Sequence, residues 1–465
     1  MKRLVTCMAI LATLPAITHA QIAMSDSVEY KLENVNSKLV LGISGASQTA
    51  GADAVQWADN GTTDHLWHFV PMGNNEYNIE NMLTHQVLGV SGASTADGAQ
   101  IVQWADSGTS DHLWEVISGS AGYYIKNVNS GLYLEVANAG TSDTAKIDQW
   151  SNTGCTCQEW TLVNTGTSPY NSPNSVSGSG IYVHDPMAIK DTSGVYWLYG
   201  THNTLATSSN LTTWTSDGEA LDPIPAWQTT FHGGTPDQWA PDVVYHNSAY
   251  FQYYAVPGPS GTTHTADIGL ATASSAKSTA WADKGVVIGS TDSSPYNAID
   301  PSIIEDTSGN WWMSFGSWSD GIYMIELNAT TGLKSTSNTT VYHLAERPNG
   351  EEGSYVYYYN GFYYLFVSID GCCDGVASTY HILVGRSSSV TGPYLDRGGL
   401  NMLNGGGTIV LSAHSNIFGP GGQSILTGSS GPILVYHYYD GNNNGTPTLG
   451  LNTLSWTSDG WPYVP

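Results

Sequence analysis

Basic residues are scarce in this chain. Its 465 residues include 13 lysines and arginines against 39 aspartates and glutamates, which gives a formal net charge of −26. Nucleic acids and anionic membranes are polyanions, so this balance argues against both as partners. Phenylalanine is also sparse, with 7 copies against 16 tryptophans and 28 tyrosines. Indole and phenol rings can stack on sugar faces, although many also pack between β-strands, so the composition favours a neutral partner.

Long apolar runs are missing after residue 20. No later run approaches 18 residues, so we expect no membrane span. Residues 1–20 combine a short basic start, a brief apolar stretch and small residues before Gln21. This pattern is typical of a secretory signal peptide, so we expect a secreted, extracellular protein.

Cysteine is rare as well. Loss of the signal peptide would remove Cys7 and leave Cys155, Cys157, Cys372 and Cys373. The two pairs fall in different expected domains, which favours a bond within each pair in the oxidising secretory route. Reduced thiols at both sites are the alternative.

We find no convincing amphipathic helix, but five aromatic stretches recur in the second half of the chain. They are residues 195–199, 250–254, 311–315, 362–366 and 433–437. Markers at Tyr196, Tyr250, Trp311, Tyr363 and Ile433 are 54, 61, 52 and 70 residues apart. These spacings suit four-stranded propeller blades with loop insertions, so the pattern predicts a five-bladed β-propeller.

A threefold repeat occupies residues 28–163. A Gln-Trp pair recurs at intervals of 47 and 46 residues, and a second tryptophan follows each pair with the same period. Three units of short alternating strands separated by Gly-rich turns predict a pseudo-threefold β-barrel. Most of the repeated tryptophans are expected to be core residues.

This repeat resembles the ricin-type β-trefoil lectins. The Gln-x-Trp signature of that family is literal only in the third repeat, at residues 158–160, and the acidic residue of its sugar site is present only there, as Glu135. The resemblance therefore implies sugar binding by the third lobe. The implied contacts are Glu135, Gln149, Trp150 and Gln158.

Residues 164–180 are rich in Thr, Ser, Gly, Asn and Pro and lack periodicity, which is typical of a flexible linker. We therefore expect an all-β chain in four parts. These are a signal peptide at 1–20, a β-trefoil at 21–166, a linker at 167–180 and a five-bladed β-propeller at 181–465.

Three carboxylates precede three of the aromatic stretches: Asp185, Asp300 and Glu352. Residues at corresponding places in successive propeller blades meet on the axis. Hydrolysis of a glycosidic bond needs one carboxylic acid to protonate the leaving oxygen and one carboxylate to attack or to activate water. Each residue alone has an ordinary explanation as a turn cap or surface charge, but together they predict one acid–base site.

Residues 181–465 resemble glycoside hydrolase family 43, and within it the endo-α-1,5-L-arabinanases. The matching segments are residues 184–186, 239–242, 268–271, 297–301, 372–373, 384–387, 391–394 and 460–463. The resemblance implies that Asp185 is the general base, Glu352 the general acid, and Asp300 the group that sets the pKa and orientation of the acid. Glu351 is the alternative acid, one residue earlier. Inversion by the family implies about 6.5 to 9.5 Å between base and acid.

The same resemblance implies substrate contacts and a metal ion. The implied contacts are His184, Trp239, Asp242, Asn297, Trp318, Cys372 and Cys373. The metal, commonly calcium, lies near the floor of the site in such enzymes. We take His437 as its candidate ligand and His414 as the second choice, against the alternative that each is a packed core histidine.

The expected function is that of a secreted inverting hydrolase which cuts internal α-1,5 linkages of arabinan, including the arabinan side chains of pectin. The trefoil would hold the enzyme near the polysaccharide, and a monomer is expected. One alternative is an exo-acting α-L-arabinofuranosidase or β-xylosidase on the same scaffold, because loops between blades shape the groove. The other is a non-catalytic protein with two carbohydrate-binding modules.

Overall fold

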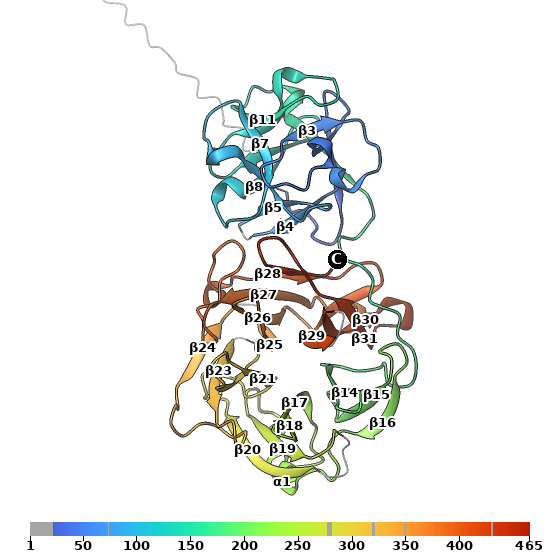
Figure 1. Ribbon diagram of the computed structural model, residues 1–465, viewed down its shortest axis with the longest axis vertical. Helices are drawn as coiled ribbons and strands as arrows, with labels where there is room; N and C mark the ends of the chain where they lie inside the picture. The colour runs from blue at the N-terminus through green and yellow to red at the C-terminus, as the bar shows by residue number, and fades with distance from the viewer. Residues whose placement is uncertain (1–21, 73, 277–280, 319–320, 348–349, 429–430) are drawn as a thin grey trace, which may run out of the picture.

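The computed structural model describes residues 22–465, apart from residue 73 and residues 277–280, 319–320, 348–349 and 429–430. The described chain forms a β-trefoil followed by a five-bladed β-propeller (Figure 1). The expected all-β class and the order of the two folds are confirmed. The expected signal peptide at residues 1–20 lies outside the described residues.

The trefoil is built from twelve short strands. They are β1 (Tyr30–Asn34), β2 (Val40–Ile43), β3 (Ala54–Trp57), β4 (Trp67–Pro71), β5 (Glu76–Asn81), β6 (Val87–Val90), β7 (Ala99–Trp104), β8 (Trp114–Ser118), β9 (Tyr123–Asn127), β10 (Tyr133–Val136), β11 (Ile147–Trp150) and β12 (Glu159–Asn164). Between them lie the 3₁₀ turns Ser44–Ala46, Thr63–His65, Ser91–Ala93, Ser110–His112, Ala137–Ala139 and Thr156–Gln158. Strand β12 pairs with β1 over five residues, which closes the barrel.

One of the two repeated tryptophans in each trefoil repeat belongs to the core, so half of the six are core residues, which corrects the expectation that most of them are. These residues, Trp67, Trp114 and Trp160, are fully buried. Each indole N–H donates to a carbonyl oxygen on the second strand of its own lobe, at 2.8 to 3.1 Å. The tryptophans that follow the repeated glutamines are exposed instead, by 37%, 45% and 39% for Trp57, Trp104 and Trp150.

Blades 1 to 4 of the propeller are four-stranded antiparallel sheets. Blade 1 comprises β13 (Met187–Lys190), β14 (Tyr196–Gly200), β15 (Thr204–Ser208) and β16 (Thr215–Glu219). Blade 2 comprises β17 (Trp239–His246), β18 (Ala249–Pro257), β19 (Ala266–Ala273) and β20 (Ala282–Ser290). Blade 3 comprises β21 (Ser302–Glu305), β22 (Trp311–Phe315), β23 (Ile322–Leu327) and β24 (Val341–Ala345). Blade 4 comprises β25 (Glu351–Tyr359), β26 (Phe362–Ile369), β27 (His381–Ser387) and β28 (Thr408–Leu411).

Blade 5 contains β29 (Ile417–Gly428), β30 (Gly431–Asp440) and β31 (Thr446–Thr453), followed by the small pair β32 (Ser455–Trp456) and β33 (Pro462–Tyr463). The five aromatic stretches therefore form the second strand of every blade. Helix α1 (Ala226–His232) precedes blade 2, and 3₁₀ turns occur at Gly375–Ala377, Met402–Asn404 and Gly441–Asn443. Within the described residues, no helix is long and apolar enough to cross a membrane.

The segment between the domains covers the outer edge of blade 5. The backbone N–H of Asn174 donates to a β31 carbonyl at 2.8 Å, and the carbonyl of Ile181 accepts from a β31 N–H at 2.8 Å. Tyr170 is buried in the core shared by blades 4 and 5. Residues 167–180 connect the domains as expected, but they are not a flexible linker, because their polar backbone finds partners on the propeller.

A buried arginine fastens the two domains together. Arg397, in the loop between β27 and β28, lies 3.3 Å from Glu80 and 3.8 Å from Asp106 of the trefoil, and 3.0 Å from Asp459 of the propeller. It also donates to the carbonyl of His85 at 3.2 Å. Burial alone would raise the pKa of Glu80 and Asp106, but histidine hydrogen bonds and Arg397 hold both below their usual values. The boundary is therefore an ionised, buried cluster.

Candidate active site

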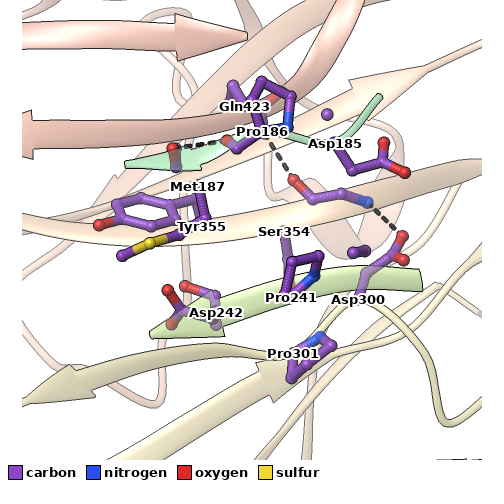
Figure 2. Close-up of a pocket in the computed structure, with 15 residues that line it drawn as sticks. Asp185, Pro186, Met187, Pro241, Asp242, Asp300, Pro301, Ser354, Tyr355 and Gln423 are labelled. Carbon is purple, nitrogen blue, oxygen red and sulfur yellow. Dashed lines mark hydrogen bonds between the residues drawn. The ribbon is translucent and has the colours of Figure 1, made fainter. Parts of the chain in front are cut away.

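Each blade brings one residue with left-handed backbone to the propeller axis, within its inner strand or just before it. These residues are Asp185 (φ 47°), Ala240 (φ 40°), Asp300 (φ 56°), Gly353 (φ 57°) and Gly422 (φ 57°). Together with the two residues that follow each of them, they line an axial channel of about 30 Å³ (Figure 2). The left-handed region is unfavourable for residues other than glycine, and such strain clusters at functional sites. Two of the five equivalent positions carry carboxylates.

Glu352 lies one residue before the equivalent position in blade 4. The expectation that Asp185, Asp300 and Glu352 occupy corresponding places is therefore wrong for the third, because Gly353 holds that place. The pairing of β25 with β26 shifts immediately after Glu352, and this bulge frees the preceding residue from the regular alternation of the strand. Asp300 accepts the Gly353 N–H at 2.9 Å, so it fixes the turn that carries Glu352.

Asp185 is surrounded by groups that favour its ionised form. Its Oδ2 accepts from Thr201 Oγ1 at 2.6 Å and from His184 Nδ1 at 2.8 Å. Burial would raise the pKa of Asp185, but His184, His437 and Thr201 outweigh it and hold the pKa well below its usual range. Asp185 is therefore a carboxylate at neutral pH.

Glu352 has the opposite environment. The hydroxyl of Tyr380 donates to its Oε1, and Ser317 Oγ donates to its Oε2 at 2.7 Å. Burial raises the pKa of Glu352, and the charge of Asp185 adds to the rise, against the lowering effect of the two hydroxyls. A raised pKa suits a group that must hold a proton before it donates one.

Two further carboxyls, Glu351 and Asp300, lie close to Glu352 and differ in their access to the groove. Glu351, the alternative acid, is only 2% exposed and does not line the groove that holds Glu352, although burial raises its pKa to about 8. Asp300 lines the groove, and burial together with the charges of Glu352 and Asp185 raises its pKa well above the usual value. The geometry therefore favours Glu352 over Glu351 as the acid.

The three candidate catalytic residues line one groove of about 780 Å³, a volume within the range of ligand-binding clefts. Six of the seven expected substrate contacts line it too: His184, Trp239, Asn297, Trp318, Cys372 and Cys373. The structure contains the Cys372–Cys373 disulfide at this groove and the Cys155–Cys157 disulfide in the trefoil. The expected pairing within each cysteine pair is confirmed.

Asp242 is the expected contact that does not reach the groove. It lies two residues beyond the axial position of blade 2, and its carboxylate points away from those of Asp185 and Asp300 (Figure 2). Its Oδ2 accepts the Ile303 N–H at 2.6 Å, and burial raises its pKa to about 7. Asp242 is therefore a buried residue of the channel between blades 2 and 3.

The expected calcium ion stays a prediction, with His437 as its candidate ligand. Nδ1 of His437 accepts the Asp185 backbone N–H at 3.1 Å, and the buried Nε2 atom of the same ring has no hydrogen-bond partner among the described residues. Ligand-type atoms of His184, Asp185 and His437 lie within 4.8 Å of one another. Calcium prefers oxygen ligands and often keeps waters, so these groups would supply only part of its coordination shell. His414 does not line the groove.

The two glutamines of the third trefoil lobe form hydrogen bonds inside the protein. Gln149 and Gln158 are fully buried, with the amide of Gln149 bonded to backbone carbonyls and the amide of Gln158 donating to Glu135 at 2.9 Å. Neither is available to a sugar, which corrects that expectation. Burial, with the charge of Asp148, raises the pKa of Glu135 to about 7, and Trp150 remains exposed.

Histidines fill the corresponding space in the first two lobes. A Cβ atom on Gly42 would lie 2.4 Å from the His65 ring, and one on Gly89 would lie 2.5 Å from the His112 ring. The glycines are thus needed for close approach of the rings. These two lobes have no counterpart of the Glu135 side chain.

Sequence reasoning missed four side chains around the catalytic carboxylates. Thr201, Ser317 and Tyr380 bond to a carboxylate directly, and Tyr439 bonds to His184. Thr201 and Ser317 share a signal, because each follows an aromatic residue and a glycine at the end of the second strand of its blade. The two tyrosines belong to blades 4 and 5 and carry no comparable signal.

An axial groove that holds one carboxyl with a lowered pKa and one with a raised pKa is the arrangement of an acid–base hydrolase of glycosidic bonds. The family model for glycosyl hydrolases family 43 matches residues 179–462, so the chain belongs to that family and is a glycoside hydrolase. The model of the ricin-type beta-trefoil lectin domain-like family matches residues 21–104 and 110–185.

Three relatives define the comparison further. The chain is 45% identical over 290 residues to the extracellular endo-alpha-(1->5)-L-arabinanase 1 of Bacillus subtilis, across 60% of this chain and 87% of the relative. It is 40% identical to the solved family 43 endo-arabinanase of Bacillus licheniformis, with TM-score 0.57 and coverage of 62% and 99%. An exo-1,5-alpha-L-arabinanase from a bovine ruminal metagenomic library is 30% identical, with TM-score 0.57 and coverage of 62% and 99%.

Proposed function

We propose that this protein is a secreted, inverting endo-hydrolase of the α-1,5 linkages of arabinan. The observation that carries the proposal is the pair of carboxyls with opposite pKa shifts in one groove, Asp185 and Glu352. Opposite shifts divide the two carboxyls into a base and an acid.

In the proposed reaction, Asp185 accepts a proton from a water molecule as that water attacks the anomeric carbon. Glu352 donates its proton to the departing glycosidic oxygen, so the bond breaks without a free alkoxide. Thr201 and His184 orient the base, and Ser317 and Tyr380 orient the acid. We expect Asp185 and Glu352 to be about 6.5 to 9.5 Å apart, with room for the water.

The choice of substrate and cellular location rests on similarity. Similarity to the two Bacillus endo-arabinanases supports arabinan as substrate and endo action, and the extracellular location of the Bacillus subtilis enzyme supports secretion. The secretory pattern at residues 1–20 agrees with that location. We propose that arabinan side chains of pectin are accessible substrates and that the enzyme acts as a monomer.

The trefoil is proposed to hold the enzyme near polysaccharide and so to raise its effective concentration. Exposed Trp150 supports sugar contact by the third lobe. Because Gln149, Gln158 and Glu135 are buried, we assign any sugar contact in this lobe to Trp150.

Exo action is the second candidate, because the ruminal exo-arabinanase has the same propeller with 30% identity. A time course of product sizes from linear 1,5-α-L-arabinan separates the two. Mixed oligomers in the earliest samples are expected for endo action. Arabinose or one fixed short oligomer alone would establish exo action. The absence of any product would indicate a carbohydrate-binding protein without catalytic activity.

A further inference from the structure

A closed loop with a disulfide joins the second and third strands of blade 4 and lines the groove. This disulfide loop, residues 370–380, connects β26 to β27 and contains Cys372 and Cys373, which are bonded to each other. Its two ends are tied, because Thr379 N–H donates to the Gly371 carbonyl at 2.9 Å and Gly371 N–H donates to Thr379 Oγ1 at 3.1 Å. The loop is therefore a defined element.

One side of the disulfide loop connects to the base. The backbone N–H of Cys373 donates to the Tyr439 hydroxyl oxygen at 2.8 Å, and that hydroxyl is 2.8 Å from His184 Nε2. His184 Nδ1 in turn donates to Asp185 at 2.8 Å. These contacts form an unbroken chain of three hydrogen bonds from the loop to the carboxylate.

The other side of the same loop connects to the acid. Tyr380, its last residue, donates its hydroxyl to Glu352 Oε1. Tyr380 is 3% exposed, so its ring is fixed by packing. The loop is therefore linked to both catalytic carboxyls, directly to Glu352 through Tyr380 and indirectly to Asp185 through Tyr439 and His184.

We propose that the disulfide loop is a positioning element that holds the base and the acid at their working separation, with Tyr439 and Tyr380 as its two positioning residues. This inference rests on the proposed roles of Asp185 and Glu352. The simpler alternative is that Cys372 and Cys373 only contact the sugar. A hydrolase of this kind needs a fixed spacing, because small misplacement of a reacting group can cost about 100-fold in rate.

The test uses the full chain and compares two substrates, linear arabinan and a nitrophenyl glycoside of an α-1,5-arabino-oligosaccharide. Tyr439→Phe removes the link to the base, so kcat should fall about tenfold or more on both substrates, with KM nearly unchanged. Tyr380→Phe removes the link to the acid. Its loss of kcat should be large on arabinan and small on the nitrophenyl substrate, whose leaving group departs without protonation.

Removal of the loop disulfide completes the test. Cys372→Ser combined with Cys373→Ser should lower kcat on both substrates, whereas Cys155→Ser combined with Cys157→Ser in the trefoil is the matched control and should keep full activity on soluble arabinan. Thermal unfolding midpoints identify any variant that fails to fold, and the two tyrosine variants then carry the test.

Three results distinguish the positioning role of the loop from a sugar contact and from failure of the proposed function. If the wild type hydrolyses arabinan but both tyrosine variants keep its kcat, the positioning role is overturned. A rise in KM without a change in kcat for the cysteine variant would show that the disulfide is only a sugar contact. If the wild type hydrolyses neither arabinan nor the nitrophenyl glycoside, the proposed function itself fails.

Discussion

Asp185 and Glu352 lie in one groove but in opposite electrostatic surroundings. Asp185 accepts hydrogen bonds from a threonine and a histidine that stabilise its charge, whereas burial and the charge of Asp185 favour the proton on Glu352. Two carboxyls of similar intrinsic pKa are thereby separated into base and acid.

Exchange of either carboxyl for its amide tests this division. Asp185→Asn and Glu352→Gln should each lower kcat on arabinan by about 10²- to 10⁴-fold while the fold and substrate binding persist. On a substrate with a good leaving group, the Glu352 variant should recover much of its rate and the Asp185 variant should not. Added azide can rescue only the Asp185 variant. Loss of activity in Glu351→Gln with full activity in Glu352→Gln would contradict the assignment of the acid.

The third carboxyl, Asp300, should act through the pH profile. The charge of Glu352 raises the pKa of Asp300, and because the interaction is reciprocal, an ionised Asp300 would disfavour ionisation of Glu352. Asp300→Asn keeps an acceptor for the Gly353 N–H but removes that charge, so the pKa of Glu352 should fall. The acid then loses its proton at lower pH, and the alkaline limb of kcat/KM should move down by about one unit. If the alkaline limb of kcat/KM, measured over pH 4 to 9, stayed at the same pH or moved to higher pH, this role for Asp300 would be contradicted.

Sequence patterns located the residues of this site better than their orientation. Aspartate before proline marked Asp185 and Asp300 correctly, because both occupy equivalent left-handed turns. The same spacing could not reveal the bulge after Glu352 or the direction of Asp242, since both depend on pairing with neighbouring strands. Nor could it reveal that Gln149 bonds internally, because its partners come from another lobe.

At the scale of elements, blade 5 depends on chain that precedes the propeller. Residues 170–181 bond to β31, bury Tyr170 and donate from Asn171 to the carbonyl of Pro465 at 3.2 Å. Periodicity predicted the aromatic second strands well, because alternation is a local property. It could not predict this edge, because Ser, Gly, Asn and Pro bond to the sheet through their backbones.

Two truncated chains test the role of this edge. A chain that starts at residue 168 keeps Tyr170 and its bonds, and one that starts at residue 181 loses them; both lack the trefoil, so they are a matched pair. Loss of a buried aromatic side chain typically costs about 3 to 5 kcal/mol. The shorter chain should therefore unfold at a clearly lower temperature, and only the longer one should keep full activity on soluble arabinan. Equal melting temperatures in calorimetry would disprove the structural role of the edge.

At the scale of the whole molecule, the two domains form one body around Arg397. Its trefoil partner Glu80 is 317 positions away in the sequence, so no local pattern could predict their contact. The order of the two folds was predictable from their repeats. Their relative orientation was not, because it depends on this buried cluster.

Arg397→Met tests the attachment of the trefoil. It leaves Glu80 and Asp106 buried without their cation, which should cost about 3 to 5 kcal/mol at the boundary. We expect a larger radius of gyration in X-ray scattering and weaker action on insoluble cell-wall material, with activity on soluble arabinan retained. Exposed Lys190→Met is the control and should change none of these. An unchanged radius for the Arg397 variant would refute the fastening role.

The central claim is that Asp185 and Glu352 together catalyse hydrolysis with inversion. Proton NMR of the wild-type enzyme acting on arabinan, recorded before mutarotation, reads the anomer of the first reducing ends directly. Activation of water by Asp185 predicts the β-anomer first, with the α-anomer appearing only later by mutarotation. Initial formation of the α-anomer would mean retention through a covalent intermediate and would contradict the account.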